Sequence, residues 1–265
     1  MASTLLSVFR NSSQTVGRLN KLSSCFFNIK NVRSIYAKST LGLDTFEEHR
    51  VKTKSHMTSI SEKFKEKMSE YAGEDSKNMI FTEDLKNMIH ITDNDKDIDL
   101  VVRMLKRYNA QNKSLRFGNY VFGPVVMRMF YVHNKADLAL ECFKSEELSG
   151  IFDQYITYQI LLDLLYENQK YDEVLEVTEI IKTKQFDGTK FPRNVVVLAL
   201  AACYKLNSKE SLEYTLKLWC ELNNVGHLPM RRAATFASAL ALNQGKPEVA
   251  LEIVSLCKNQ NYTTV

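Results

Sequence analysis

Apolar residues recur at helical spacing in the segment 156–182. The segment carries two apolar stripes at the 3.6-residue period, separated by a polar turn at 167–170. The second helix is expected to start near Asp172, because an acidic side chain favours a helix N-terminus. Two such short helices are only marginally stable in isolation. The pattern therefore predicts an antiparallel pair that is stabilised by packing against neighbouring helices. The stripes consist of Ile160, Leu161, Leu164 and Leu165, and of Val174, Val177 and Ile181.

The same pattern recurs along the chain. A large residue, a polar turn and an acid repeat at Tyr131, Tyr166, Tyr204 and Leu242, which lie 35, 38 and 38 residues apart. A recurring period of this size predicts an all-α fold, a right-handed α-solenoid of about five antiparallel helical hairpins. The alternative is a set of unrelated hairpins in an ordinary bundle. The pairs are expected at 80–106, 121–147, 156–184, 194–222 and 232–257.

The first 40 residues differ from the rest of the chain. They contain six basic residues, many Ser and Thr, and no acid, which is typical of a mitochondrial transit peptide. A disordered basic arm is the alternative. Removing these six of the 35 basic residues leaves 29 against 31 acidic residues, a formal charge of −2. The positive balance of the whole chain is therefore no evidence for nucleic-acid binding.

Three further segments complete the expected organisation. Residues 41–78 are expected to form a charged leader helix and a linker, with a narrow apolar stripe between Met57 and Tyr71. The α-solenoid is expected over 79–258, and 259–265 form a C-terminal tail. No apolar run is long enough to predict a transmembrane helix.

The sequence offers no catalytic constellation. The five cysteines include no C-x-x-C, and the five histidines have no spacing suited to a metal. The acidic run at 93–99 lacks the Gly and Glu that an EF-hand loop needs at its sixth and twelfth positions, where Ile98 and Met104 stand. We therefore expect no enzyme, no metal and no cofactor, and we expect the acids of this run to cap a helix.

The best repeat resembles the pentatricopeptide repeat family. The resemblance rests on Ile156-Thr157-Tyr158-Gln159, on the polar turn and on Asp172-Glu173-Val174-Leu175-Glu176, and it extends from about Asp97 to Cys257. It implies a non-enzymatic protein of the mitochondrial matrix that binds single-stranded RNA, with RNA-processing or ribosomal proteins as further partners. It also implies a role in maturing a mitochondrial transcript and thereby in respiratory chain function.

The family reads about one base per repeat with two or three side chains, which implies candidate contacts here. Gln159 and Thr235 are expected to face base edges, although the register counterparts Pro124 and Val197 are poor hydrogen-bonding groups. Basic residues interleave with aromatic ones at 107–120, a modest sign of nucleic-acid binding. The candidate RNA-binding residues are Gln159, Ile156, Thr235, Arg232, Asn194, Arg116 and Lys113.

Two other functions stay open on the residues alone. A helical protein scaffold, within the mitochondrial ribosome or an assembly complex, is favoured by the near-neutral charge after residue 40 and by the apolar reader positions. A nuclease subunit is the third alternative, and it lacks a catalytic constellation.

Overall fold

A computed structural model describes residues 34–73, 76–115, 120–185, 189–227 and 230–256. Every regular element in these ranges is a helix, and none of them contains a strand, which confirms the all-α prediction. The chain divides into 1–34 and Ile35–Val265, and only the second unit is described below. The expected transit peptide lies almost wholly outside the described residues. Among the described residues, no helix combines the length and apolar character needed to cross a membrane.

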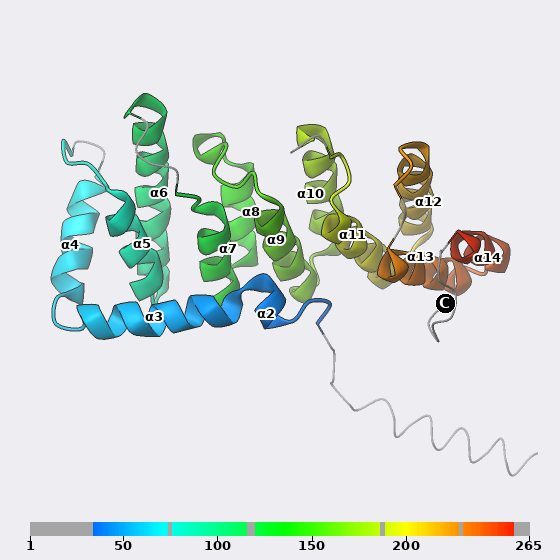
Figure 1. The fold of residues 1–265 in the computed structure, drawn as a ribbon, viewed down its shortest axis with the longest axis horizontal. Coiled ribbons are helices and arrows are strands. Elements are labelled where there is room, and N and C mark those ends of the chain that lie inside the picture. Colours follow the sequence, from blue (N-terminus) through cyan, green and yellow to red (C-terminus); the bar gives the residue numbers. More distant parts are fainter. Residues whose placement is uncertain (1–33, 74–75, 116–119, 186–188, 228–229, 257–265) are drawn as a thin grey trace, which may run out of the picture. The chain divides into compact units, whose positions relative to one another are not determined.

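Five helical pairs follow one another along the chain (Figure 1). The first helix of each pair contacts the first helix of the next, in the order α5, α7, α9, α11 and α13. This neighbour-to-neighbour order is typical of helical repeats; the right-handed superhelix stays a prediction. The pairs are α5 (Thr82–Ile91) and α6 (Asp95–Leu115), α7 (Gly123–Val132) and α8 (Ala136–Lys144), α9 (Tyr155–Glu167) and α10 (Tyr171–Lys184), α11 (Arg193–Leu206) and α12 (Lys209–Asn224), and α13 (Arg231–Asn243) and α14 (Pro247–Ser255), with the 3-10 turn η2 (Glu146–Leu148) after α8.

The turns inside four of these pairs share one backbone conformation. The fourth residue of each repeated motif has a positive φ: Asn134 at 52°, Gln169 at 60°, Asn207 at 47° and Gly245 at 67°. This left-handed conformation ends a helix and reverses the chain, and Asn and Gly adopt it most readily. The repeat seen in the sequence is therefore a repeat of backbone geometry.

Short polar side chains cap the starts of α6 and α12. At α6 the Asn94 Oδ1 accepts from the Asp97 backbone N–H at 3.0 Å, and the Asp97 carboxylate accepts from the Asp93 N–H at 3.0 Å. At α12 the Ser208 hydroxyl accepts from the Ser211 N–H at 3.1 Å. The acidic run at 93–99 thus caps a helix, as expected from the sequence.

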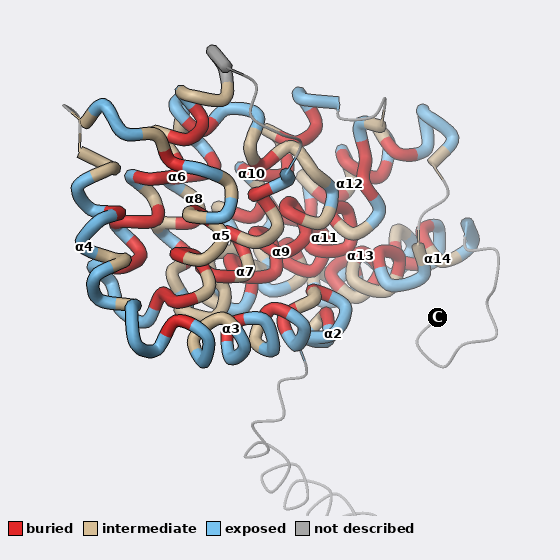
Figure 2. The backbone as a smooth tube through the Cα atoms, turned by 60° about the vertical axis from the view of Figure 1, so that its left-hand side comes forward, coloured by how far each residue is buried: buried red, intermediate tan, exposed pale blue. Residues whose placement is uncertain are grey.

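The core lies where the first helices meet. Figure 2 shows buried residues along α9 and α11, and every residue from Thr157 to Tyr166 is buried. One apolar cluster extends from Tyr36 to Ala202, and a second joins α11 to α12, α13 and α14. Burial of apolar surface at about 25 cal/mol per Å² makes these contacts the main stabilising contribution.

The expected leader helix is three helices. They are α2 (Lys38–Leu41), α3 (Leu43–Met57) and α4 (Ser61–Tyr71). The single-helix interpretation is wrong because the helix is interrupted between α3 and α4. Ile60, at this interruption, is 52% exposed and does not join the apolar stripe. α3 packs on α5 and α7, and α2 on α9 (Figure 1). We call Ile35–Met57 the N-terminal strap.

The strap belongs to the folded body. Tyr36 and Leu41 are buried, at 6% and 1% exposure. Arg50, in the middle of α3, is also buried and donates to the carbonyl oxygens of His90 at 3.4 Å and Thr92 at 2.5 Å. The boundary expected at residue 40 therefore falls inside α2, and the folded unit starts at Ile35.

Candidate RNA-binding face

Five of the seven candidate residues lie on the first helices of three pairs. Ile156 and Gln159 lie on α9, Asn194 on α11, and Arg232 and Thr235 on α13. Because α9, α11 and α13 are successive neighbours, the fold places these residues along one row of helices. Arg116 and the side chain of Lys113 lie outside the described residues.

The amide of Gln159 is engaged within the protein. Gln159 is 5% exposed, and its Oε1 accepts from Asn194 Nδ2 at 2.7 Å. Asn194 Oδ1 in turn accepts from the Tyr36 hydroxyl at 3.1 Å. This chain of hydrogen bonds links the strap to α11 and α9. Burial raises the pKa of Tyr36 to about 12, so its hydroxyl keeps the proton that it donates.

Arg232 also contacts the strap. Its Nη1 donates to the Ile35 carbonyl oxygen at 3.2 Å, and its guanidinium carbon lies 5.7 Å from the centre of the Tyr36 ring. The second contact is a cation–π interaction, worth about 0.5–1 kcal/mol at an exposed site. The side chain is exposed, so part of the guanidinium still faces solvent.

The other candidates are less available for base recognition. The Thr235 hydroxyl donates to the Arg231 carbonyl oxygen at 3.0 Å, within its own helix. Ile156 packs against the main apolar cluster, and Val197, the register counterpart of Gln159, is fully buried. With the strap in place, a base cannot reach the Gln159 amide, because the amide is buried and already bound to Asn194.

A buried carboxyl lies one turn along α9 from Gln159 and was not a candidate. Asp163 is 0% exposed; its Oδ2 accepts from the Tyr131 hydroxyl at 2.9 Å, while its Oδ1 has no hydrogen-bond partner. Burial raises its pKa to about 7, opposed by the Tyr131 hydrogen bond. The signal was present in the sequence, since Asp163 is the only charged residue in the apolar run 160–165.

Polar groups therefore gather beneath the strap. The Gln159 Nε2 and the Asp163 Oδ1 are both buried without a partner, one turn apart on α9. Unsatisfied buried polar atoms each cost about 1–3 kcal/mol. The contact under the strap thus carries two unsatisfied polar atoms, a cost that a wholly apolar contact would not have.

Comparison with known proteins agrees with the family resemblance. The chain is 30% identical over 236 residues to human "pentatricopeptide repeat-containing protein 2, mitochondrial", 33% identical over 181 residues to the Xenopus laevis protein of that name, and 36% identical over 181 residues to the mouse protein. These alignments cover 89%, 68% and 68% of this chain, but 60%, 47% and 47% of the relatives. The chain thus spans about half to three fifths of their length.

The resemblance to the pentatricopeptide repeat family is confirmed by these relatives, and their names confirm the expected mitochondrial localisation. No family model matches the chain. No solved structure matches it either.

Proposed function

We propose that this chain is a non-enzymatic RNA-binding protein of the mitochondrial matrix that supports maturation of a mitochondrial transcript and, through it, the respiratory chain. The similarity to mitochondrial pentatricopeptide repeat proteins carries the proposal. The row of first helices supports it, because repeats of this kind present successive side chains along one surface. Enzymes that cut or modify the transcript would be separate proteins.

RNA crosslinking in isolated mitochondria tests this function. We expect a discrete set of transcripts to be crosslinked to the protein. The purified protein should bind those RNAs with an affinity that falls steeply with salt, because each phosphate contact releases counterions. Crosslinking no stronger than that of an unrelated matrix protein would contradict the proposal.

We also propose that residues before Ile35 are removed on import. The acid-free composition of this segment and the start of the folded unit at Ile35 support the proposal. N-terminal sequencing of the mitochondrial form should find a first residue close to Ile35. A mitochondrial chain that begins at Met1 or Ala2 would contradict it.

A protein scaffold, in the mitochondrial ribosome or an assembly complex, is the second candidate. One observation favours it: Gln159 and Asn194 are bound to each other and to the strap, so these positions are closed to a base. In that case, purification from mitochondria treated with ribonuclease should recover the same protein partners as purification from untreated mitochondria.

A further inference from the structure

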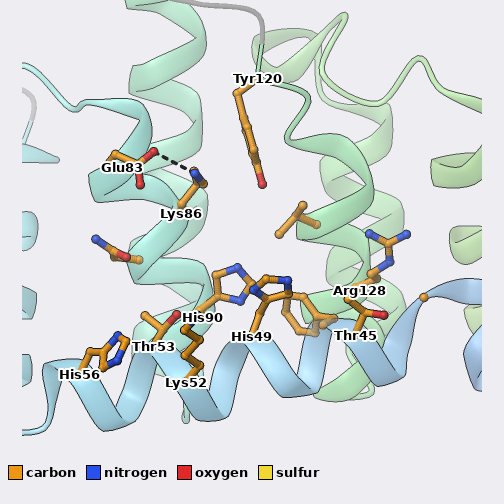
Figure 3. A pocket seen from close by; sticks show the side chains of 14 residues that line it. Thr45, His49, Lys52, Thr53, His56, Glu83, Lys86, His90, Tyr120 and Arg128 are labelled. Carbon is orange, nitrogen blue, oxygen red and sulfur yellow. Dashed lines mark hydrogen bonds and ion pairs between the residues drawn. The ribbon is translucent and has the colours of Figure 1, made fainter.

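A groove of about 660 Å³ lies between α3, α5 and the start of α7. It is separate from the row of candidate readers on α9, α11 and α13. Figure 3 shows that its walls bear side chains from three elements, with His49 of α3 and His90 of α5 close together and Tyr120 on the opposite side. The two imidazole centres lie 5.9 Å apart. The groove exists only because the strap lies across the repeats.

The basic residues of α3 divide between two surfaces. Arg50 and Lys54 both pair with Asp93, on the loop between α5 and α6. The groove side instead carries His49, Lys52 and His56, at helical spacing. No carboxylate contacts the Lys52 ammonium in the part of the chain that the structure describes. The strap thus uses Arg50 and Lys54 to attach itself, and Lys52 is left without an acidic partner among the described residues.

Arg128 adds a half-buried cation from α7. Its Nε donates to the Leu41 carbonyl oxygen at 2.8 Å, and burial lowers its pKa. No carboxylate pairs with it among the described residues. A cation withdrawn from water gains most from an anionic partner, and a guanidinium suits the two oxygens of a phosphate.

Gly42 allows the close approach of Arg128. A Cβ on Gly42 would lie 2.8 Å from the Arg128 Nη2, and the φ of Gly42 is +69°, which disfavours other residues. The turn between α2 and α3 is thereby shaped around the guanidinium.

The acidic residue that lines the groove, Glu83, is paired with a lysine. The Glu83 carboxylate accepts from Lys86 Nζ at 2.8 Å, and this ammonium lies 4.9 Å from the centre of the Tyr120 ring. Tyr120 is 37% exposed, so part of its ring is open to a ligand. An aromatic ring beside unpaired cations is the combination that binds single-stranded nucleic acid, through base stacking and phosphate contacts.

His90 lines the groove as an uncharged ring. Its Nδ1 is buried without a hydrogen-bond partner. Burial, followed by His49 and Arg50, lowers the pKa of His90 to about 4, so the ring is uncharged at neutral pH. The ring therefore adds no charge to the groove, and its buried Nδ1 is closed to a ligand.

We propose that this groove binds single-stranded RNA, with backbone phosphates at Lys52 and Arg128 and one base against the Tyr120 ring. The proposal rests on the proposed RNA-binding function. It places the contact between α3, α5 and the start of α7, where Gln159 need not be uncovered. The strap is then part of the RNA-binding surface instead of a cover to be removed.

Binding of a mixed-sequence single-stranded RNA at several salt concentrations tests the groove. We expect Lys52→Ala to weaken binding to all RNAs alike and to reduce the slope of log affinity against log salt by about 0.7, the value for one phosphate contact on a single strand. Arg128→Gln should act in the same way. Lys63→Ala is the matched control, since it removes an exposed lysine of α4 outside the groove and should leave the slope unchanged.

Tyr120 offers an independent readout. Ultraviolet crosslinking followed by peptide mass spectrometry should identify RNA on Tyr120 and not on Tyr155, which is equally exposed at 37% but lies outside the groove. Inorganic phosphate and a free mononucleotide, added as competitors, should displace the RNA only at far higher concentration, because neither spans the groove.

The outcomes separate the two proposals. If the parent protein binds RNA but Lys52→Ala and Arg128→Gln bind it equally well, the groove is not the site and the RNA-binding function stands. If the parent protein binds no RNA, both proposals fail. If inorganic phosphate competes as well as RNA does, the groove is a phosphate site and the proposed RNA contact is overturned.

Discussion

Asp163 shows how a single buried carboxyl couples this fold to pH. Its pKa is raised from 3.8 to about 7, chiefly by burial. The folded carboxyl keeps its proton where the unfolded one has lost it. The folded state therefore loses stability as the pH rises from about 4 to about 7.

Asp163→Asn should remove this dependence while keeping an acceptor for the Tyr131 hydroxyl. The measured quantity is the free energy of unfolding of the variant minus that of the parent. We expect this difference to be roughly 2–3 kcal/mol larger at about pH 8 than at about pH 5, because each unit of pKa shift contributes about 1.4 kcal/mol. Urea unfolding at the two pH values measures it. A difference that does not change with pH would show that Asp163 is ionised in the folded protein.

The sequence predicted the positions of individual residues better than their partners. Its repeat register placed Gln159, Asn194 and Arg232 on neighbouring first helices, because position in a periodic motif fixes the helix and the turn. It could not predict that Tyr36, which is 158 residues from Asn194, donates a hydrogen bond to that amide. Such a pairing depends on tertiary packing, which no local pattern encodes.

The strap is the element that the sequence predicted least well. The buried positions of α3 are Leu43, Phe46, Arg50 and Met57, which have helical spacing but include an arginine. A buried arginine interrupts the apolar stripe, and only the structure shows that its guanidinium binds the carbonyl oxygens of His90 and Thr92. The five helical pairs were easier to predict, because their stripes are apolar and their turns repeat.

Truncation tests the contribution of the strap. A chain that begins at Ile35 should melt at the same temperature as the full chain, because the folded unit starts there. A chain that begins at Leu43 loses buried Tyr36 and Leu41, each worth about 1.5–3 kcal/mol. It should melt at least about 5 °C lower, by the usual relation between stability and melting temperature for this size.

Thermal unfolding followed by circular dichroism compares the two chains. Equal melting temperatures would mean that residues 35–42 do not stabilise the repeats. A loss already present in the chain that begins at Ile35 would instead show that residues before the described unit contribute to stability.

At the scale of the whole molecule, stability is expected to be unequal along the repeats. The strap contacts α5, α7 and α9, whereas α14 packs mainly on α13 and leaves Leu251 72% exposed. Repeat proteins open locally where neighbour contacts are fewest.

Amide hydrogen exchange measures this difference. We expect amides in the middle of α7 and α9 to exchange at least about ten times more slowly than those of α14, a difference of about 1.4 kcal/mol in opening free energy. Uniform exchange across the pairs would mean that the described chain unfolds as one cooperative unit.

The hydrogen bond between Tyr36 and Asn194 and the contact of Arg232 with Ile35 have a consequence for the order of folding. They join residues 158 and 197 positions apart. A growing chain releases its N-terminus first, so the strap is made before the helices that receive it. Arg50 of α3 reaches the end of α5 over 40–42 residues, whereas Ile35 and Tyr36 close far longer loops and pay a larger loop-closure entropy. The first residues of the strap are therefore the last to dock, and until then the Tyr36 ring is exposed to chaperones.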